Sequence, residues 1–223
     1  MPTNLDVLKA ELGFEAAYAQ PEFDLFEGPS RLLDRVYQRL EKHGIRLSDL
    51  RAENSSIIGE RYLHCYLFNY AMTVKVRYDK IEINCVEFPR SHIEKYAAGI
   101  LDVLAAVKDA LPKLSYKAFA IAVALHGRIE GQATRDFLRL LSVKSPEGLG
   151  PSTGSGVVFY YGQEKERLLS SITADISAAV QDAIFLRIHG VWDGSRISAE
   201  SLPKLANDFV SLALGALGFQ LKA

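Results

Sequence analysis

The chain has 223 residues, of which 48% are hydrophobic and 24% are charged, a composition typical of globular proteins. Its 26 basic and 27 acidic residues nearly cancel, and no dense Lys/Arg block or acidic tail departs from this balance, so a polyanion-binding surface is not indicated. The first residues lack a signal-peptide pattern, and no apolar run reaches the length of a membrane span. We therefore expect a cytoplasmic protein with no membrane contact.

The first half of the chain alternates between strand-like and helix-like periodicity. Apolar residues recur at helical spacing after Pro29 until Gly44. Ser91 and Glu94 form a capping box before a longer apolar stripe that ends at Pro112. Period-two alternation between these helices indicates strands, which a turn connects near residues 79–80. The sequence predicts strands over 4–18, 46–54, 61–68, 74–78 and 81–85 and helices over 29–44 and 91–111. The alternation slips after residue 85, and a β-bulge at Val86 would explain this slip.

The second half shows the same order of elements. Its last helix follows Ser198 or Ser201, keeps its apolar residues on one face and ends at Gly218. The sequence predicts strands over 116–126, 156–162, 167–177 and 183–191 and helices over 132–143 and about 201–217. Across both halves, the residues expected in the core are Val76, Ile83, Ile100, Leu104, Ile184, Leu186, Phe209 and Val210.

Three pairs of segments correspond in pattern between the halves. They are LKAELGFEAAY with YKAFAIAVALHG, SRLLDRVYQRL with ATRDFLRLLSV, and IEKYAAGILDVLAAVKDAL with LPKLANDFVSLALGALG. We interpret the chain as an internal duplication of units 1–113 and 114–223, which form two domains or one continuous domain. The alternative is that two unrelated halves share an order of elements.

The expected fold class is α+β. Each unit reads as helix-grip-like, with a strand, a helix, antiparallel strands and a long helix, and the helices pack on one face of the sheet. This order resembles the duplicated saddle of the TATA-binding protein. The stretches GVVFYY, SITADIS and DAIFLRIHGVWD, with the closing helix, resemble a sporadically distributed family of uncharacterised bacterial proteins of similar length. That resemblance implies a bacterial origin and a two-unit fold, and it supplies no catalytic residue.

No stretch carries a specific catalytic, cofactor or metal-binding signature. Cys65 and Cys85 both lie in strand-like alternation and are expected to be buried thiols rather than a disulfide or a reactive pair. His64 and Cys65 are adjacent in one strand, so their side chains point to opposite faces. Asp175 and His189 lie on successive strands and could form an acid–base pair, but solvated positions explain them better. We expect no metal and no cofactor.

The candidate binding residues lie in one loop and at the end of one strand. The glycine-rich loop 145–156 lacks the Gly-Lys-Ser/Thr of a phosphate-binding loop and is expected to be a surface contact segment through Gly148, Gly150 and Gly154. Trp192 is the only tryptophan and lies where a strand leads towards the last helix. Such a residue is more often a packing anchor at the end of a strand, but we expect it and neighbouring Arg187 to form a contact rim.

Three classes of function are compatible with this sequence. The leading expectation is a non-enzymatic binding or assembly protein that acts through a protein–protein interface or through self-association. The alternative is a small-molecule binder or enzyme with a cavity between sheet and long helix, which needs a few polar groups converging in that cavity. A nucleic-acid-binding saddle is the least favoured class because the charge is balanced.

Overall fold

The computed structural model describes residues 3–26, 29–86, 93–141 and 156–221 and confirms the α+β class. Within these ranges the strands are β1 (Thr3–Tyr18), β2 (Leu50–Glu53), β3 (Tyr62–Leu67), β4 (Met72–Val76), β5 (Lys80–Val86), β6 (Tyr116–Ile129), β7 (Val157–Tyr161), β8 (Arg167–Ile176), β9 (Ile184–Asp193) and β10 (Phe219–Leu221). The helices are α1 (Pro29–Leu40), α2 (Ile93–Ala110), α3 (Thr134–Leu141) and α4 (Leu202–Ala216), and short 3-10 turns include η2 (Glu41–His43) and η6 (Ala199–Ser201).

All ten strands belong to one sheet, so the two halves are not separated into two sheets. The strand order is β2-β3-β4-β5-β1-β6-β9-β8-β7, and β10 pairs in parallel with the start of β1. The other pairs are antiparallel. The first strand of each half lies at the centre of the sheet. In the first half β1 lies beside β5, and in the second half β6 lies beside β9. This order agrees with the layout expected from the sequence, and the duplication itself stays a prediction.

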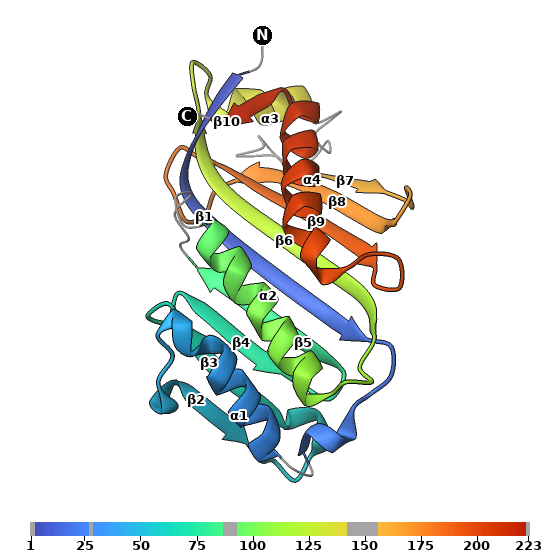
Figure 1. Ribbon diagram of the computed structural model, residues 1–223. Coiled ribbons are helices and arrows are strands. Elements are labelled where there is room, and N and C mark those ends of the chain that lie inside the picture. The colour runs from blue at the N-terminus through green and yellow to red at the C-terminus, as the bar shows by residue number, and fades with distance from the viewer. Residues whose placement is uncertain (1–2, 27–28, 87–92, 142–155, 222–223) are drawn as a thin grey trace.

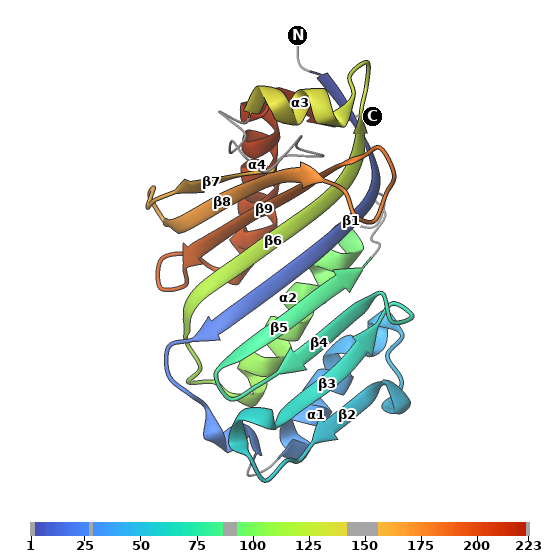
Figure 2. The same ribbon diagram turned by 180° about the vertical axis from the view of Figure 1, so that it is seen from behind.

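Three helices cover one face of the sheet. Figure 1 shows α1, α2 and α4 in front of the strands, whereas Figure 2 shows the opposite face, which we call the open face, largely free of helices. The burial of β4 alternates residue by residue, as expected for a strand with one face in the core. Helix α3 lies at one end of the sheet, where Phe137 packs on Phe219 of β10 with ring centroids 4.7 Å apart.

The core lies between the sheet and the three covering helices. The expected core residues are buried with one exception, Val210, which is partly buried and packs against the core. The expected bulge at Val86 is wrong. The register of β5 with β1 continues without a shift to the pair Val86–Glu11, and Val86 is simply an exposed residue of the open face. A register shift lies instead in β1, between Val7 and Lys9.

Trp192 is buried in this core, so the expectation that it forms an exposed rim is wrong. Its relative exposure is 3%, and its ring packs edge-on against Phe209 of α4 with centroids 5.7 Å apart. The indole lies back over Gly190, where an added Cβ would come within 2.6 Å of the ring. Glycine at 190 therefore provides the space that the indole occupies.

We expect Trp192→Ala to lower the free energy of unfolding by about 3–5 kcal/mol, because it empties a large volume between β9 and α4. Urea unfolding followed by circular dichroism measures this loss. The matched control is Leu212→Ala on the outer side of α4, where the side chain is 62% exposed and the change should stay within about 0.5 kcal/mol. Equal stabilities of the two variants would contradict the anchoring role of Trp192.

Candidate functional site

A mainly apolar groove lies between α2 and α4. Its floor consists of the central strands β1 and β6, and its volume is about 760 Å³, within the range of small-molecule sites. The two helices belong to different halves of the chain and stand on either side of the β1–β6 pair (Figure 1). We call this opening the α2–α4 groove.

The walls and floor of the α2–α4 groove are mostly aliphatic. The floor is formed by Ala10, Leu12 and Phe14 of β1 and by Ile121, Val123 and Leu125 of β6. The walls are formed by Tyr96, Ala97, Ile100 and Leu101 of α2 and by Leu202, Pro203, Ala206 and Val210 of α4. Several of these side chains are only partly buried, which indicates that no protein side chain fills the space above them.

A few polar groups also line the α2–α4 groove, including the half-buried Lys9 of β1, which pairs with Glu11 at 2.9 Å. Asn207 and Ser211 are exposed on α4 and are four residues apart, so they lie on the same side of that helix. Asp6 is exposed on β1 beside Leu8, which lies at the register shift and is 46% exposed. The interior of the groove therefore suits an apolar occupant, and its mouth offers a few hydrogen-bonding groups.

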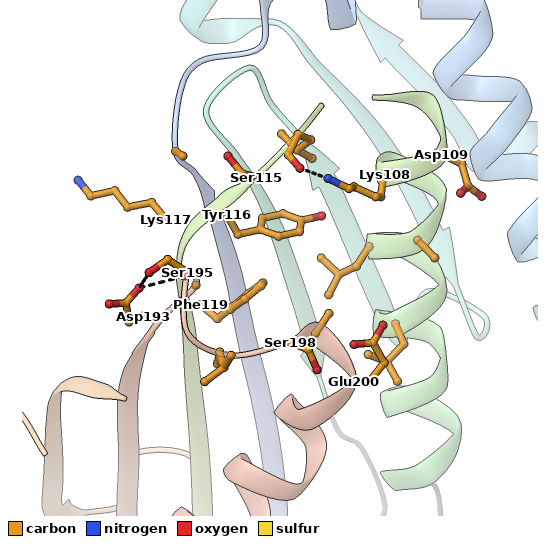
Figure 3. A pocket seen from close by; sticks show the side chains of 18 of the residues that line it. Lys108, Asp109, Ser115, Tyr116, Lys117, Phe119, Asp193, Ser195, Ser198 and Glu200 are labelled. Atoms are coloured by element: carbon orange, nitrogen blue, oxygen red, sulfur yellow. Dashed lines mark hydrogen bonds between the residues drawn. The ribbon is translucent and has the colours of Figure 1, made fainter. Parts of the chain in front are cut away.

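A second cavity of about 960 Å³ continues beyond Leu101, a residue that lines both openings. It lies between the C-terminal half of α2 and the segment that leads from β9 through η6 into α4 (Figure 3). Phe119 and Tyr116 of β6 contribute its floor. Its lining is more polar than that of the α2–α4 groove, with Ser198 and Glu200 on the side of η6.

Three charged residues that line the second cavity form contacts with other parts of the chain. Lys108 donates a hydrogen bond to the carbonyl oxygen of Leu114. Asp109 points away from the cavity in Figure 3 and pairs with Arg39 of α1, with 2.8 Å between Nη2 and Oδ2. Asp193 accepts a hydrogen bond of 2.6 Å from the hydroxyl of Ser195. These contacts stabilise the local structure and do not converge on the cavity.

The hydroxyl group of Tyr116 is an unpaired donor in the described lining of the second cavity. The ring of Tyr116 projects from β6 towards α2, and its buried hydroxyl finds no hydrogen-bond partner among the described residues. The hydroxyl of Tyr18, on the adjacent strand, is in the same situation, and the two rings lie 6.1 Å apart. Burial raises the pKa of both phenols, so both stay protonated at neutral pH and can donate a hydrogen bond.

A largely buried carboxylate, Asp102, joins α2 to η2. Oδ2 of Asp102 lies 2.7 Å from Nε2 of His43, and Nζ of Lys42 donates to Oδ1 at 3.0 Å. Burial acts to raise the pKa of Asp102, but the hydrogen bonds and charges of Lys42 and His43 outweigh it and lower the pKa below its usual value. This contact ties the end of α1 to α2, and Asp102 also lines the second cavity.

The two cysteines confirm the expectation of buried thiols. Both are free and lie on the core side of β3 and β5. Burial raises the pKa of Cys65 and of Cys85 to about 12, so neither carries appreciable thiolate at neutral pH. The side chain of His64 lies on the open face and that of Cys65 lies on the core side, as the alternation of a strand requires.

The structure does not bring the remaining sequence candidates together. Arg187 is exposed on the open face, but Trp192 lies on the core side of the same strand. Gly148, Gly150 and Gly154 lie outside the described residues. Within the described ranges, no group of three His, Cys, Asp or Glu side chains is placed to hold a metal ion.

Asp175 and His189 do not face each other. Ser171 is the residue of β8 that lies opposite His189, whereas Asp175 lies opposite Phe185 and is exposed. Burial, followed by the charge of Arg187, lowers the pKa of His189, so this imidazole is neutral at neutral pH. The interpretation of Asp175 as a solvated strand position is confirmed.

Ion pairs occupy much of the open face around β1, β4 and β5. Nζ of Lys80 lies 2.9 Å from Glu15 and 2.8 Å from Glu82, and Arg77 lies 3.8 Å from Glu82. Basic side chains that are already paired with carboxylates are poor partners for phosphates. This pairing weakens the alternative of a nucleic-acid-binding saddle.

Comparisons with known proteins give no family assignment, because no family model matches the chain and a search of curated proteins finds no similar one. In the described part of the chain, no helix combines the length and the apolar character needed to cross a membrane.

Replacing Asp102 with Asn should remove a stabilising contribution that depends on pH. Because the folded pKa of Asp102 is lowered, this contribution is present above the ordinary pKa of a carboxyl group and is lost as the pH falls through the folded pKa. At neutral pH we expect Asp102→Asn to cost about 1–3 kcal/mol. The difference in unfolding free energy between wild type and variant, followed by urea titrations from neutral pH to about pH 2, should shrink with acid.

Asp109→Asn is the matched control, because Asp109 is also paired across α1 and α2 but its side chain is 45% exposed. Its effect should be below about 1 kcal/mol. If the Asp102→Asn difference were constant over the whole pH range, the ionised contact with Lys42 and His43 would not be the source of the stability.

Proposed function

We propose that the protein is a non-enzymatic binding protein that holds an apolar small molecule in the α2–α4 groove. The observation that carries this proposal is the unfilled aliphatic space of about 760 Å³ above the central strands. An apolar ligand that enters it removes its own surface and the groove lining from water, which stabilises the complex by roughly 25 cal/mol per Å² of apolar surface buried before the cost of association is subtracted.

The polar groups favour an elongated, mainly aliphatic molecule over a compact polar metabolite. The helical walls of the groove carry no charged side chain among their described residues, and Lys9 of β1, which also lines the groove, pairs with Glu11 at 2.9 Å. A charge deep between the helices would therefore lose its hydration without gaining a partner on the walls. Asn207 and Ser211 at the mouth can hydrogen-bond a polar end group that stays near solvent. A fatty-acid-like or isoprenoid-like molecule has this distribution of polarity.

An assembly role, the leading expectation from the sequence, stays a second proposal. The contact region expected from the sequence loses support, because Trp192 is buried and the glycines lie outside the described residues. Exposed apolar side chains of the edge strand β7 favour assembly instead, with Tyr160 82% exposed. The groove and this edge are separate surfaces, so the two roles are compatible.

The test is to fill the α2–α4 groove. Ala206 lines the groove on α4, and Ala206→Phe should place a ring where the ligand would lie. We expect wild type to bind a fluorescent polyene fatty acid and the variant to bind it at least about tenfold more weakly, equivalent to about 1.4 kcal/mol. Fluorescence titration measures the Kd, and the melting temperature should not fall because the ring enters empty space.

Ala216→Phe is the matched control, because Ala216 is exposed on the same helix and does not line the groove. It should bind the probe as wild type does. Equal affinities of the two variants, or no binding by wild type of either the fatty acid or a neutral apolar dye, would exclude the α2–α4 groove as the binding site.

A further inference from the structure

The edge strand β7 lacks a partner on its outer side within the described part of the chain. It pairs with β8 and lies last in the strand order, so every second residue directs its backbone N–H and C=O groups away from the sheet. Such an edge is a template for pairing with another strand unless the sequence protects it.

The sequence of β7 has none of the usual protective features. Its five residues, VVFYY, include no charged residue and no proline, and all of them have high strand propensity. The opposite edge differs, because β2 reads LRAE and exposes Arg51 and Glu53. Charged side chains are a common means of discouraging pairing at an edge, so β7 is the edge suited to association.

Exposed hydrophobic side chains extend from β7 onto its neighbour. On the open face, Tyr160 is 82% exposed and Val158 is 46% exposed. Leu169 of β8 is 47% exposed and lies diagonal to Tyr160, because Ser171 is the residue opposite Tyr160. On the other face of the strand, Tyr161 is 44% exposed. A strand added at this edge would lie directly beside the three side chains of β7, and Leu169 extends the apolar surface behind them.

We infer that two copies of this chain associate through β7, antiparallel and about a two-fold axis near Phe159. In this register Val158 lies opposite Tyr160 of the partner subunit, and Val157 lies opposite Tyr161 of the partner subunit. Pairs of an aromatic and a β-branched residue are among the favourable cross-strand pairs. The strand carries no charge, so two copies meet without like-charge repulsion. This inference deepens the assembly proposal and does not depend on the α2–α4 groove.

A second copy fits this edge better than a head-to-tail arrangement of the same chain. Pairing β7 with β2 would leave a free β7 and a free β2 at the two ends, so the chains would continue into an open filament. Pairing β7 with β7 uses the same patch twice and closes at two subunits. Because five residues bury little surface, the dimer should be weak and visible mainly at high concentration.

Sedimentation velocity from micromolar to near-millimolar concentration tests this association. Wild type should shift towards the mass of a dimer as the concentration rises. The double variant Val158→Lys with Tyr160→Lys places lysine side chains opposite each other in the dimer, and its Kd for dimerisation should be higher by about tenfold or more. The variant Val158→Glu with Tyr160→Glu should behave in the same way.

Mixing the lysine variant with the glutamate variant should restore the dimer, because opposite charges then face each other across the two-fold axis. A loss of folding in either variant would not produce this recovery. Leu212→Lys, on the outer side of α4, is the control for adding charge at an exposed leucine and should dimerise as wild type does.

Three results would overturn the inference: a wild type that stays monomeric at every concentration, a dimer that survives both double variants unchanged, or a mixture of the two variants that stays monomeric. None of these results bears on ligand binding, because that is measured separately at the α2–α4 groove.

Discussion

The antiparallel pairing of β1 with β6 is the interaction on which the rest of this structure depends. Its register runs from the pair Leu5–Ile129 to the pair Tyr18–Tyr116 and joins the two halves of the chain over the length of both strands. On the core side Phe14 packs against Phe119, with ring centroids 6.2 Å apart. Because β1 also pairs with β5 and β6 also pairs with β9, this central pair joins the strands of both halves of the chain into one sheet with one core.

The position of the α2–α4 groove follows from this central pair. Each long helix covers the strands of its own half, and the twist of a sheet turns neighbouring strands, and the helices on them, away from each other. The strands at the junction therefore have α2 on one side and α4 on the other, rather than a single helix above them. The space above Leu12 and Val123 stays open between the partly exposed walls of the groove. A groove at this place is thus a consequence of joining two helix-covered units edge to edge.

Most elements were predictable because their periodicity is regular, and the errors have identifiable causes. The alternation that correctly placed Ile184 and Leu186 in the core also assigns Trp192 to the core side, since all three are an even number of residues apart. Continuing the same alternation to the end of β9 would have placed Trp192 in the core rather than on the rim. The groove and β10 were not predictable, because both depend on how segments far apart in the sequence meet.

The two halves differ at their outer edges, and this difference limits how the protein can associate. The first half adds β2 beyond β3, with Arg51 and Glu53 at its edge, and the contact of Asp102 with His43 and Lys42 fixes α1 beside α2. The second half ends, in the described residues, at the uncharged β7. If both edges were uncharged, each chain could pair at two places and form fibres. With only one such edge, the pairing of β7 with β7 that we propose uses this edge and stops at two subunits.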